Sequence, residues 1–208
     1  MFKLAIMLLV LSISALTSHA RFDDTPAQLE ERFGNSITNL PGFADVAGVA
    51  VYSKNDLFIT VFFMYPNGQH KGTSKAQLIF YTRAKPFSGF SIASDLAPNE
   101  IRTVLETVKG RWEGTDPQNV NSSSSIGILD ARQGAIAKML QEAMRIIYPH
   151  EYTYTPLSMC HNGSKIFAFH IIHGVTICSS DAVDGLLSWA GHIKNMKTEP
   201  SPKKLSGL

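Results

Sequence analysis

An apolar segment in the first half of the chain, Leu57–Met64 (LFITVFFM), dominates the pattern of hydrophobic and polar positions. Thr60 is its one polar residue. Side chains of a strand alternate between two faces, so a strand that is apolar at nearly every position has both faces covered. Turn residues flank the segment on each side. The pattern predicts an antiparallel meander with strands at Val46–Tyr52, Leu57–Met64 and Lys75–Arg83.

Two helices are predicted around this meander. Thr25 and Gln28 form a capping-box pattern around Pro26, and Gly34 is suited to end the short helix that they begin. The second helix is predicted at Pro98–Lys109, where apolar residues recur every three or four positions. Its apolar stripe, which we expect to lie on one face of the meander, consists of Ile101, Val104, Leu105 and Val108.

The second half of the chain has a similar order of elements. Residues 131–148 favour a helix capped by Asp130, but Gly134 interrupts the pattern and a β-hairpin is the alternative. Three strands are then predicted, at Glu151–Cys160, Lys165–Ile172 and Val175–Ser179. A last helix is predicted at Ala182–Met196. The predicted fold class is α+β, with antiparallel meanders, helices packed on the sheet, and two helix-βββ-helix halves as one possible arrangement.

Residues 1–20 have the pattern of a signal peptide. Lys3 precedes the apolar run Leu4–Leu16, whose 13 residues are fewer than the roughly 20 that span a bilayer. Ser18 and Ala20 are small residues at the positions that a signal peptidase reads. We therefore expect cleavage near Ala20 and a secreted chain, either periplasmic or extracellular. No later segment is long and apolar enough to predict a membrane span in the mature chain.

Polar sequence divides the mature chain into two predicted α+β lobes. Residues 116–125 (DPQNVNSSSS) are expected to be a linker or surface loop between lobes at 21–115 and 126–197, and residues 198–208 a disordered tail. Charged residues make up 17% and apolar residues 44% of the chain, which favours a folded protein over a disordered one. A formal net charge of +2 is too small to indicate a surface that binds nucleic acid.

Three segments carry a resemblance to known proteins: TPAQLEERFG, the strands ending in KAQLIFYTR, and LAPNEIRTVLETVKGRW. Together they resemble small exported bacterial α+β proteins of uncharacterised function, in which a helix ending in glycine precedes a meander and a helix followed by Gly and Trp. The resemblance covers residues 25–112 and implies no catalytic residue. It also implies a β-rich region at 131–148. The opening helix is similar to that of small outer-membrane-assembly lipoproteins, but the lipidated cysteine is missing here.

The only cysteines are Cys160 and Cys178. In an exported chain this pair predicts one disulfide closing a loop of about 18 residues, which would stabilise the fold by about 3 kcal/mol. The predicted strands argue against that bond, because a central strand would separate the cysteines by roughly 10 Å, beyond the limit of about 7 Å between bridged Cα atoms. The disulfide and the meander are therefore alternatives.

Three histidines near the cysteines, His161, His170 and His173, suggest a metal site, but their spacing matches no standard zinc pattern. His170 shares a predicted strand face with apolar residues, as a hydrogen-bonded core histidine would. Cys160 and His161 are adjacent on a predicted strand and point to opposite faces, so they form no thiol–base pair and no catalytic residue is predicted. Trp112 is expected to cover the edge of the core, with an exposed contact for a partner as the alternative.

The sequence predicts helices and strands along most of the chain but shows no group of residues arranged for catalysis. This combination favours a non-enzymatic function. We expect an exported module, without a cofactor, whose sheet or helix edge binds a protein, an envelope component or a small apolar ligand. A secreted hydrolase that uses Cys160 or a histidine is one alternative. A metal-binding protein that uses the histidine cluster is another.

Overall fold

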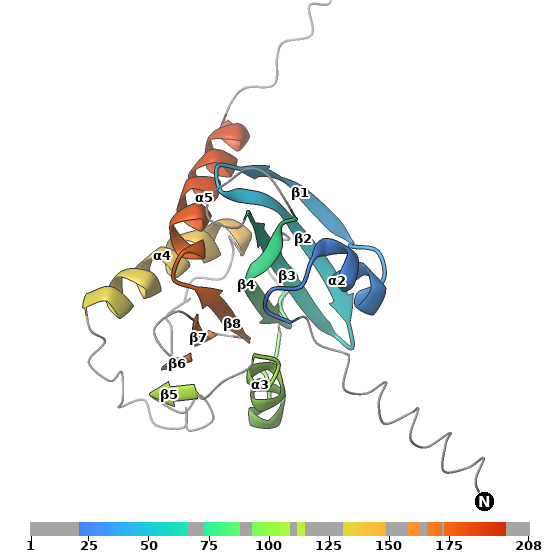
Figure 1. Ribbon diagram of the computed structural model, residues 1–208, viewed down its shortest axis with the longest axis vertical. Coiled ribbons are helices and arrows are strands. Elements are labelled where there is room, and N and C mark those ends of the chain that lie inside the picture. Colours follow the sequence, from blue (N-terminus) through green and yellow to red (C-terminus); the bar gives the residue numbers. More distant parts are fainter. Residues whose placement is uncertain are drawn as a thin grey trace, which may run out of the picture.

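The described part of the chain forms one antiparallel sheet of eight strands with helices on both faces (Figure 1). The computed structural model describes residues 21–65, 73–87, 93–108, 112–114, 131–148, 158–162, 166–171 and 173–198. The strands are β1 (Thr38–Phe43), β2 (Val46–Lys54), β3 (Leu57–Met64), β4 (Lys75–Thr82), β5 (Trp112–Gly114), β6 (Ser158–Asn162), β7 (Ile166–Ile171) and β8 (Gly174–Ser179). The helices are α2 (Pro26–Phe33), α3 (Pro98–Leu105), α4 (Ala131–Ile147) and α5 (Ala182–Thr198).

The strand order is β1-β2-β3-β4-β8-β7-β6-β5, and every neighbouring pair is antiparallel. β4 and β8 pair from Leu78 opposite Cys178 to Thr82 opposite Gly174. This pairing joins the two predicted lobes, so both halves of the chain contribute strands to one sheet. The α+β fold class predicted from the sequence is confirmed.

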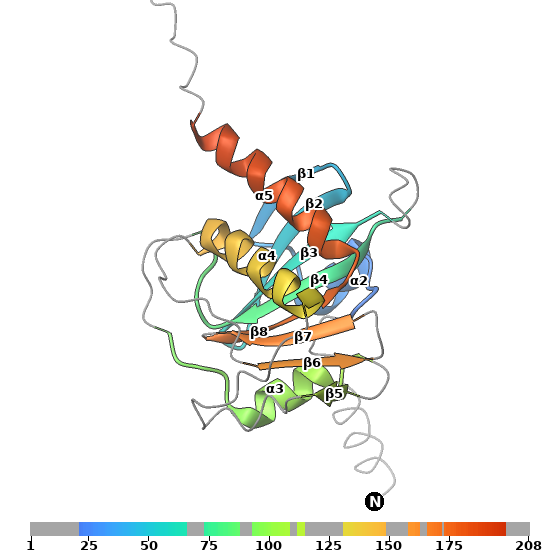
Figure 2. The ribbon, with the colours of Figure 1, turned by 90° about the vertical axis from the view of Figure 1, so that its left-hand side faces the viewer.

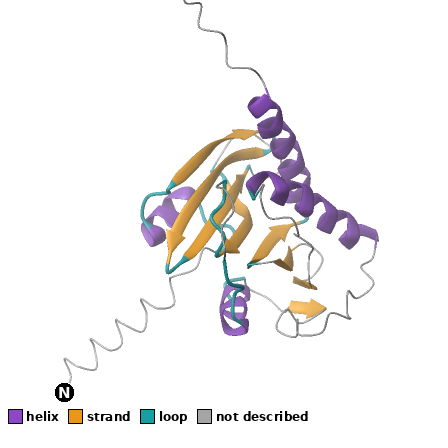
Figure 3. Cartoon of the chain, turned by 180° about the vertical axis from the view of Figure 1, so that it is seen from behind, coloured by secondary structure: helices purple, strands orange, loops and turns teal. Residues whose placement is uncertain are grey.

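The apolar segment Leu57–Met64 is β3, an interior strand between β2 and β4. Phe62 lies in the core that α4 and α5 cover, while Val61 lies in the core under α2 and α3. Both side chains are completely buried, as the uninterrupted apolar pattern predicts. Figure 2 shows α4 and α5 in front of the sheet, and Figure 3 shows α2 on the side opposite to them.

The helices at each end of the first meander begin as their sequences predict. The Thr25 and Gln28 side chains cap each other's backbone N–H groups, which completes the predicted capping box, and Gly34 ends α2 with a φ of 78°. α3 ends at Leu105 rather than at Lys109, and a turn follows it. The four residues of its predicted stripe are all buried, Val108 within that turn included.

The ambiguous segment 131–148 forms helix α4, so the hairpin alternative is wrong. Its buried residues follow helical spacing and comprise Ile136, Leu140, Ala143, Met144 and Ile147. They pack with α5 in the same core cluster. Burial of this stripe outweighs the helix-weakening effect of Gly134.

Two strands were not predicted. One is β1, whose alternating pattern Pro41 and Gly42 interrupt, and the other is β5, of which three residues are described. β6, described at Ser158–Asn162, extends beyond the predicted end at Cys160, and residues 151–157 of that predicted strand lie outside the described residues. The predicted signal peptide, the linker at 116–125 and nearly all of the predicted tail lie outside the described residues. None of the described helices is long and apolar enough to cross a membrane.

Candidate functional site

The two cysteines lie on β6 and β8, with β7 between them. Cys160 pairs with Ala168 of β7, and Cys178 pairs with Phe167. Cys178 is a buried free cysteine, so the structure contains the meander and not the predicted disulfide. The physical reason is the intervening strand, which separates the outer strands by roughly 10 Å.

Burial also decides the chemistry of Cys178. It raises the pKa of the Cys178 thiol to about 12, so the sulfur is protonated at neutral pH and is a poor nucleophile. Cys178 lies in the apolar core with Leu78 and Phe167. The side chain of Cys160 lies outside the described part of the structure.

His170 is buried on β7, in line with the predicted core position. Among the described residues, neither of its ring nitrogens has a hydrogen-bond partner, contrary to the expectation of a hydrogen-bonded histidine. Burial lowers the pKa of His170, and the Asp95 carboxylate opposes that effect. The ring is therefore an uncharged group in apolar surroundings at neutral pH.

His173 lies at the turn between β7 and β8 with a φ of 62°. Its backbone N–H donates to Asp95 Oδ1 at 2.8 Å, and its Nδ1 lies 3.3 Å from the same oxygen. No group of three or more His, Cys, Asp or Glu side chains that could hold a metal ion occurs in the part of the chain that the structure describes. The side chain of His161 is outside that part, so the metal hypothesis stays a prediction.

Trp112, at the start of β5, is half-buried against the core that α2 and α3 cover. Its indole Nε1 donates to the carbonyl oxygen of Leu105 at 3.0 Å. The same carbonyl, at the last residue of α3, also accepts from the Val108 N–H at 3.2 Å, so the indole adds a second donor at the helix end. The indole therefore covers the end of α3 at the core edge, and its polar atom is engaged there.

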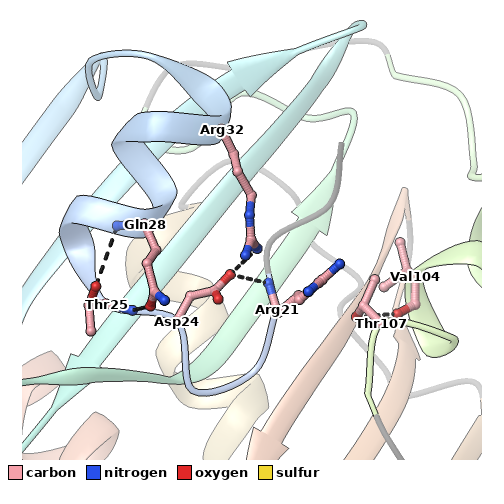
Figure 4. Close-up of polar contacts among 7 residues, drawn as sticks. All are labelled: Arg21, Asp24, Thr25, Gln28, Arg32, Val104 and Thr107. Atoms are coloured by element: carbon pink, nitrogen blue, oxygen red, sulfur yellow. Dashed lines mark hydrogen bonds and ion pairs between the residues drawn. The ribbon is translucent and has the colours of Figure 1, made fainter. Parts of the chain in front are cut away.

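A polar cluster that the sequence analysis did not identify lies where the segment before α2 pairs with β4, and we call it the Asp24 cluster (Figure 4). Asp24 is 5% exposed and pairs with the Arg32 guanidinium through its Oδ2 atom. The backbone nitrogen of Arg21 donates to the same oxygen at 2.7 Å. One buried carboxylate oxygen thus receives a guanidinium from the last turn of α2 and a backbone donor from the segment before it.

Tyr81 of β4 extends the Asp24 cluster toward α3. Its pKa is raised, mainly by complete burial and also by the Asp24 carboxylate, while a hydrogen bond with Thr107 and the Arg32 charge act in the opposite direction. The Thr107 hydroxyl donates to the carbonyl oxygen of Val104 at 2.6 Å. The phenol is therefore neutral, and the cluster links α2, β4 and α3 through polar contacts.

Two exposed apolar residues flank the first strand. Ile37, the residue before β1, and Phe43, the last residue of β1, are 52% and 42% exposed, and they are the only large hydrophobic residues exposed among those described. The Phe43 ring stacks on His192 of α5, with ring centres 4.1 Å apart and planes 7° from parallel. β1 is an edge strand of the sheet. We call this surface, formed by Ile37, Pro41, Phe43 and His192, the β1 edge.

The middle of the β1 edge is protected against pairing with a further strand. Pro41 has no backbone N–H, and its carbonyl oxygen accepts a hydrogen bond from Trp189 Nε1 of α5 at 3.0 Å. Both features block the backbone pairing by which an edge strand recruits another chain. At Pro41, therefore, the β1 edge offers a partner strand no backbone donor, and the carbonyl oxygen there is already engaged.

The described geometry accounts for stability more readily than for bond-breaking chemistry. Asp24 forms an ion pair with Arg32, Tyr81 is a neutral phenol, and Cys178 is a protonated thiol. Arg83, the residue after β4, binds both carboxylate oxygens of Glu100 on α3, at 2.7 and 3.0 Å. Comparison of the chain with protein-family models, curated proteins and solved structures finds no match.

Proposed function

We propose that this chain is an exported, non-enzymatic binding protein that loses residues 1–20 during export and contacts a protein partner through the β1 edge. The observation that carries this proposal is the exposure of Ile37, just before the edge strand β1, and of Phe43 at its end. Single exposed apolar residues are ordinary. Here, however, the stacking of Phe43 on His192 fixes an exposed aromatic ring before any partner arrives.

A fixed aromatic ring is an efficient contact, because binding then costs little side-chain entropy. Aromatic residues are also enriched in protein interfaces. The six steps from Ile37 to Phe43 correspond to roughly 20 Å of extended chain. A partner that places apolar side chains at both points, along an extended segment or across one face, fits this surface.

Photo-crosslinking tests the proposed surface directly. A photoreactive phenylalanine analogue replaces Phe43 in the source cells, and a matched analogue replaces Glu106, an exposed residue just after α3. We expect one discrete protein adduct from position 43, weakened by Ile37→Ser, and none from position 106. Identical adducts from both positions, or no adduct from position 43, would contradict the proposal.

The competing hypothesis of a secreted thiol hydrolase depends on Cys160, because Cys178 is buried and protonated. Alkylation of the native protein by iodoacetamide at neutral pH, with Cys160→Ser as the control, distinguishes the two. We expect slow labelling, without the rate enhancement of an activated thiolate. Fast labelling that disappears in Cys160→Ser would favour the hydrolase.

A further inference from the structure

The segment that precedes α2 is attached to the core from its first described residue. The Asp23 N–H donates to the Ala76 carbonyl oxygen at 2.9 Å, and the Ala76 N–H donates to the Asp24 carbonyl oxygen at 2.8 Å. The Asp24 N–H donates back to the Arg21 carbonyl oxygen at 3.1 Å, which closes a turn. Phe22 packs against the core within this turn. The position of Arg21 is therefore fixed by β4, which is an interior strand.

This turn holds the Arg21 nitrogen 2.7 Å from Asp24 Oδ2, whereas the Arg21 guanidinium points away from that carboxylate (Figure 4). Asp24 is the only carboxylate buried among the described residues. A buried carboxylate is costly unless positive charge and hydrogen bonds surround it. In the precursor, the Arg21 nitrogen is an amide with one hydrogen and no charge.

We propose that the Ala20–Arg21 bond is the processing site of the exported chain, and that Asp24 binds the α-ammonium group which cleavage creates on Arg21. The inference rests on the proposed export, for which Ser18 and Ala20 provide the expected small residues. A signal peptidase hydrolyses this amide with one water molecule. The water oxygen becomes part of the Ala20 carboxylate, and both water hydrogens end on the Arg21 nitrogen as it becomes an ammonium group.

Cleavage strengthens an existing contact without a change of fold. The existing bond already has a charged acceptor, and cleavage makes its donor a cation as well, which adds a charge–charge attraction to the hydrogen bond. A carboxylate at this distance also raises the pKa of an α-amino group above its usual range of about 7.7–8.0. Arg32 shares the same oxygen and opposes the second positive charge, while Asp23, whose carboxylate accepts from the Gln77 side chain, adds a negative charge nearby.

The contact also distinguishes the cleavage position. A chain that begins at Ala20 still has an amide at the Arg21 nitrogen, with its ammonium group one residue away. A chain that begins at Phe22 lacks the Arg21 nitrogen altogether. Only a chain that begins at Arg21 places the new positive charge against Asp24.

The test compares purified chains that begin at Arg21 or at Ala20, each with Asp24, Asp24→Asn or Asp23→Asn. At pH 7 we expect the chain beginning at Arg21 to melt about 2–4 °C higher, the shift typical of one good interaction in a protein of this size. We expect the difference to persist in Asp23→Asn, to disappear in Asp24→Asn, and to fade above pH 10 as the amine loses its proton. If Asp24→Asn does not fold, acetylation of Arg21 in the unchanged chain supplies the same comparison.

Mass spectrometry of the N-terminus of the protein recovered from its source cells separates the possible failures. A chain that begins at Arg21 supports both proposals. A chain that keeps residues 1–20, or that is found only inside the cell, overturns the proposed export. Cleavage at a different bond, or equal melting temperatures for the two chains, overturns capture by Asp24 and leaves the export proposal standing.

Discussion

Asp24 and His170 are both buried, but only Asp24 has hydrogen-bonding partners among the described residues. Asp24 has the Arg32 guanidinium and the Arg21 nitrogen on one oxygen. His170 has no hydrogen-bond partner among the described residues, and burial lowers its pKa. The partners of Asp24 come from the same short segment of chain, so little conformational entropy is lost when the loops between them close. The comparison shows that this protein buries charge where the local chain supplies a counter-charge, and otherwise buries an uncharged ring.

The largest effect is expected from Arg32→Leu, which leaves the Asp24 carboxylate buried without its guanidinium. We expect the free energy of unfolding to fall by about 3 kcal/mol, as for other buried ion pairs that lose one member. Urea unfolding measures this change. Lys138→Leu, an equal change of charge at an exposed position of α4, is the control and should change stability by less than about 0.5 kcal/mol. A loss below about 1 kcal/mol for Arg32→Leu would show that the pair is not effectively buried.

Three buried threonines extend the comparison to neutral groups. The Thr82 hydroxyl donates to the Ala84 carbonyl oxygen at 2.9 Å and lies 2.8 Å from the Tyr148 hydroxyl, whereas the Thr60 and Thr176 hydroxyls have no partner among the described residues. Thr82→Val should therefore lower the free energy of unfolding by about 2 kcal/mol.

The same substitution at Thr60 or Thr176 serves as the matched control. It should be neutral or raise stability by up to about 1 kcal/mol, because it removes a buried hydroxyl that has no hydrogen bond. Thermal and urea unfolding of the three variants test this order. Equal losses at all three positions would mean that the valine methyl groups, rather than the hydrogen bonds, decide the outcome.

The neutral state of His170 predicts sensitivity to acid. Its pKa is lowered in the folded protein, while the unfolded chain binds a proton near the usual value of about 6.5. Stability is therefore complete above that pH and decreases as the pH falls below it, by at most about 1.4 kcal/mol per pH unit.

His170→Leu should remove this part of the pH dependence, which urea unfolding at pH 7.5 and pH 5.5 measures. His192→Leu is the control, since His192 is only half-buried beneath the Phe43 ring. A pH dependence that is unchanged in His170→Leu would show that other groups cause the loss of stability in acid.

The smallest effect on stability is expected at the β1 edge. Phe43→Ser removes an exposed ring and should lower the free energy of unfolding by less than about 1 kcal/mol. If the β1 edge binds a partner, the same variant should weaken that binding at least tenfold, as loss of an interfacial aromatic anchor commonly does. Calorimetry with the partner identified by crosslinking measures the change, and unchanged affinity would exclude Phe43 from the interface.

Much of the fold could be predicted from hydrophobic spacing, because that signal is local. β3 was predicted with its observed bounds, since a strand covered on both faces needs apolar residues at nearly every position. The helical stripe in 131–148 also favoured the observed helix despite Gly134. β1 was missed because Pro41 and Gly42 are typical of turns, and only Trp189 and β2 reveal why they fit an edge strand.

The polar sites were harder to predict, because their partners are brought together by the tertiary fold. The alternating pattern placed His170 in the core, but it did not show that its nitrogens lack partners. Asp24 and Arg32 are close in sequence, yet the turn that brings the Arg21 nitrogen onto Asp24 depends on pairing with Ala76 of β4. The spacing of residues along the chain does not predict that contact.

The pKa of the α-amino group of Arg21 in the processed protein tests the capture of the new N-terminus by Asp24 most directly. Titration of a chain labelled with ¹⁵N and beginning at Arg21 measures it by NMR. We predict a pKa above the usual range of about 7.7–8.0 in the unchanged protein and a return to that range in Asp24→Asn. A value within the usual range in both chains would contradict the proposed ion pair.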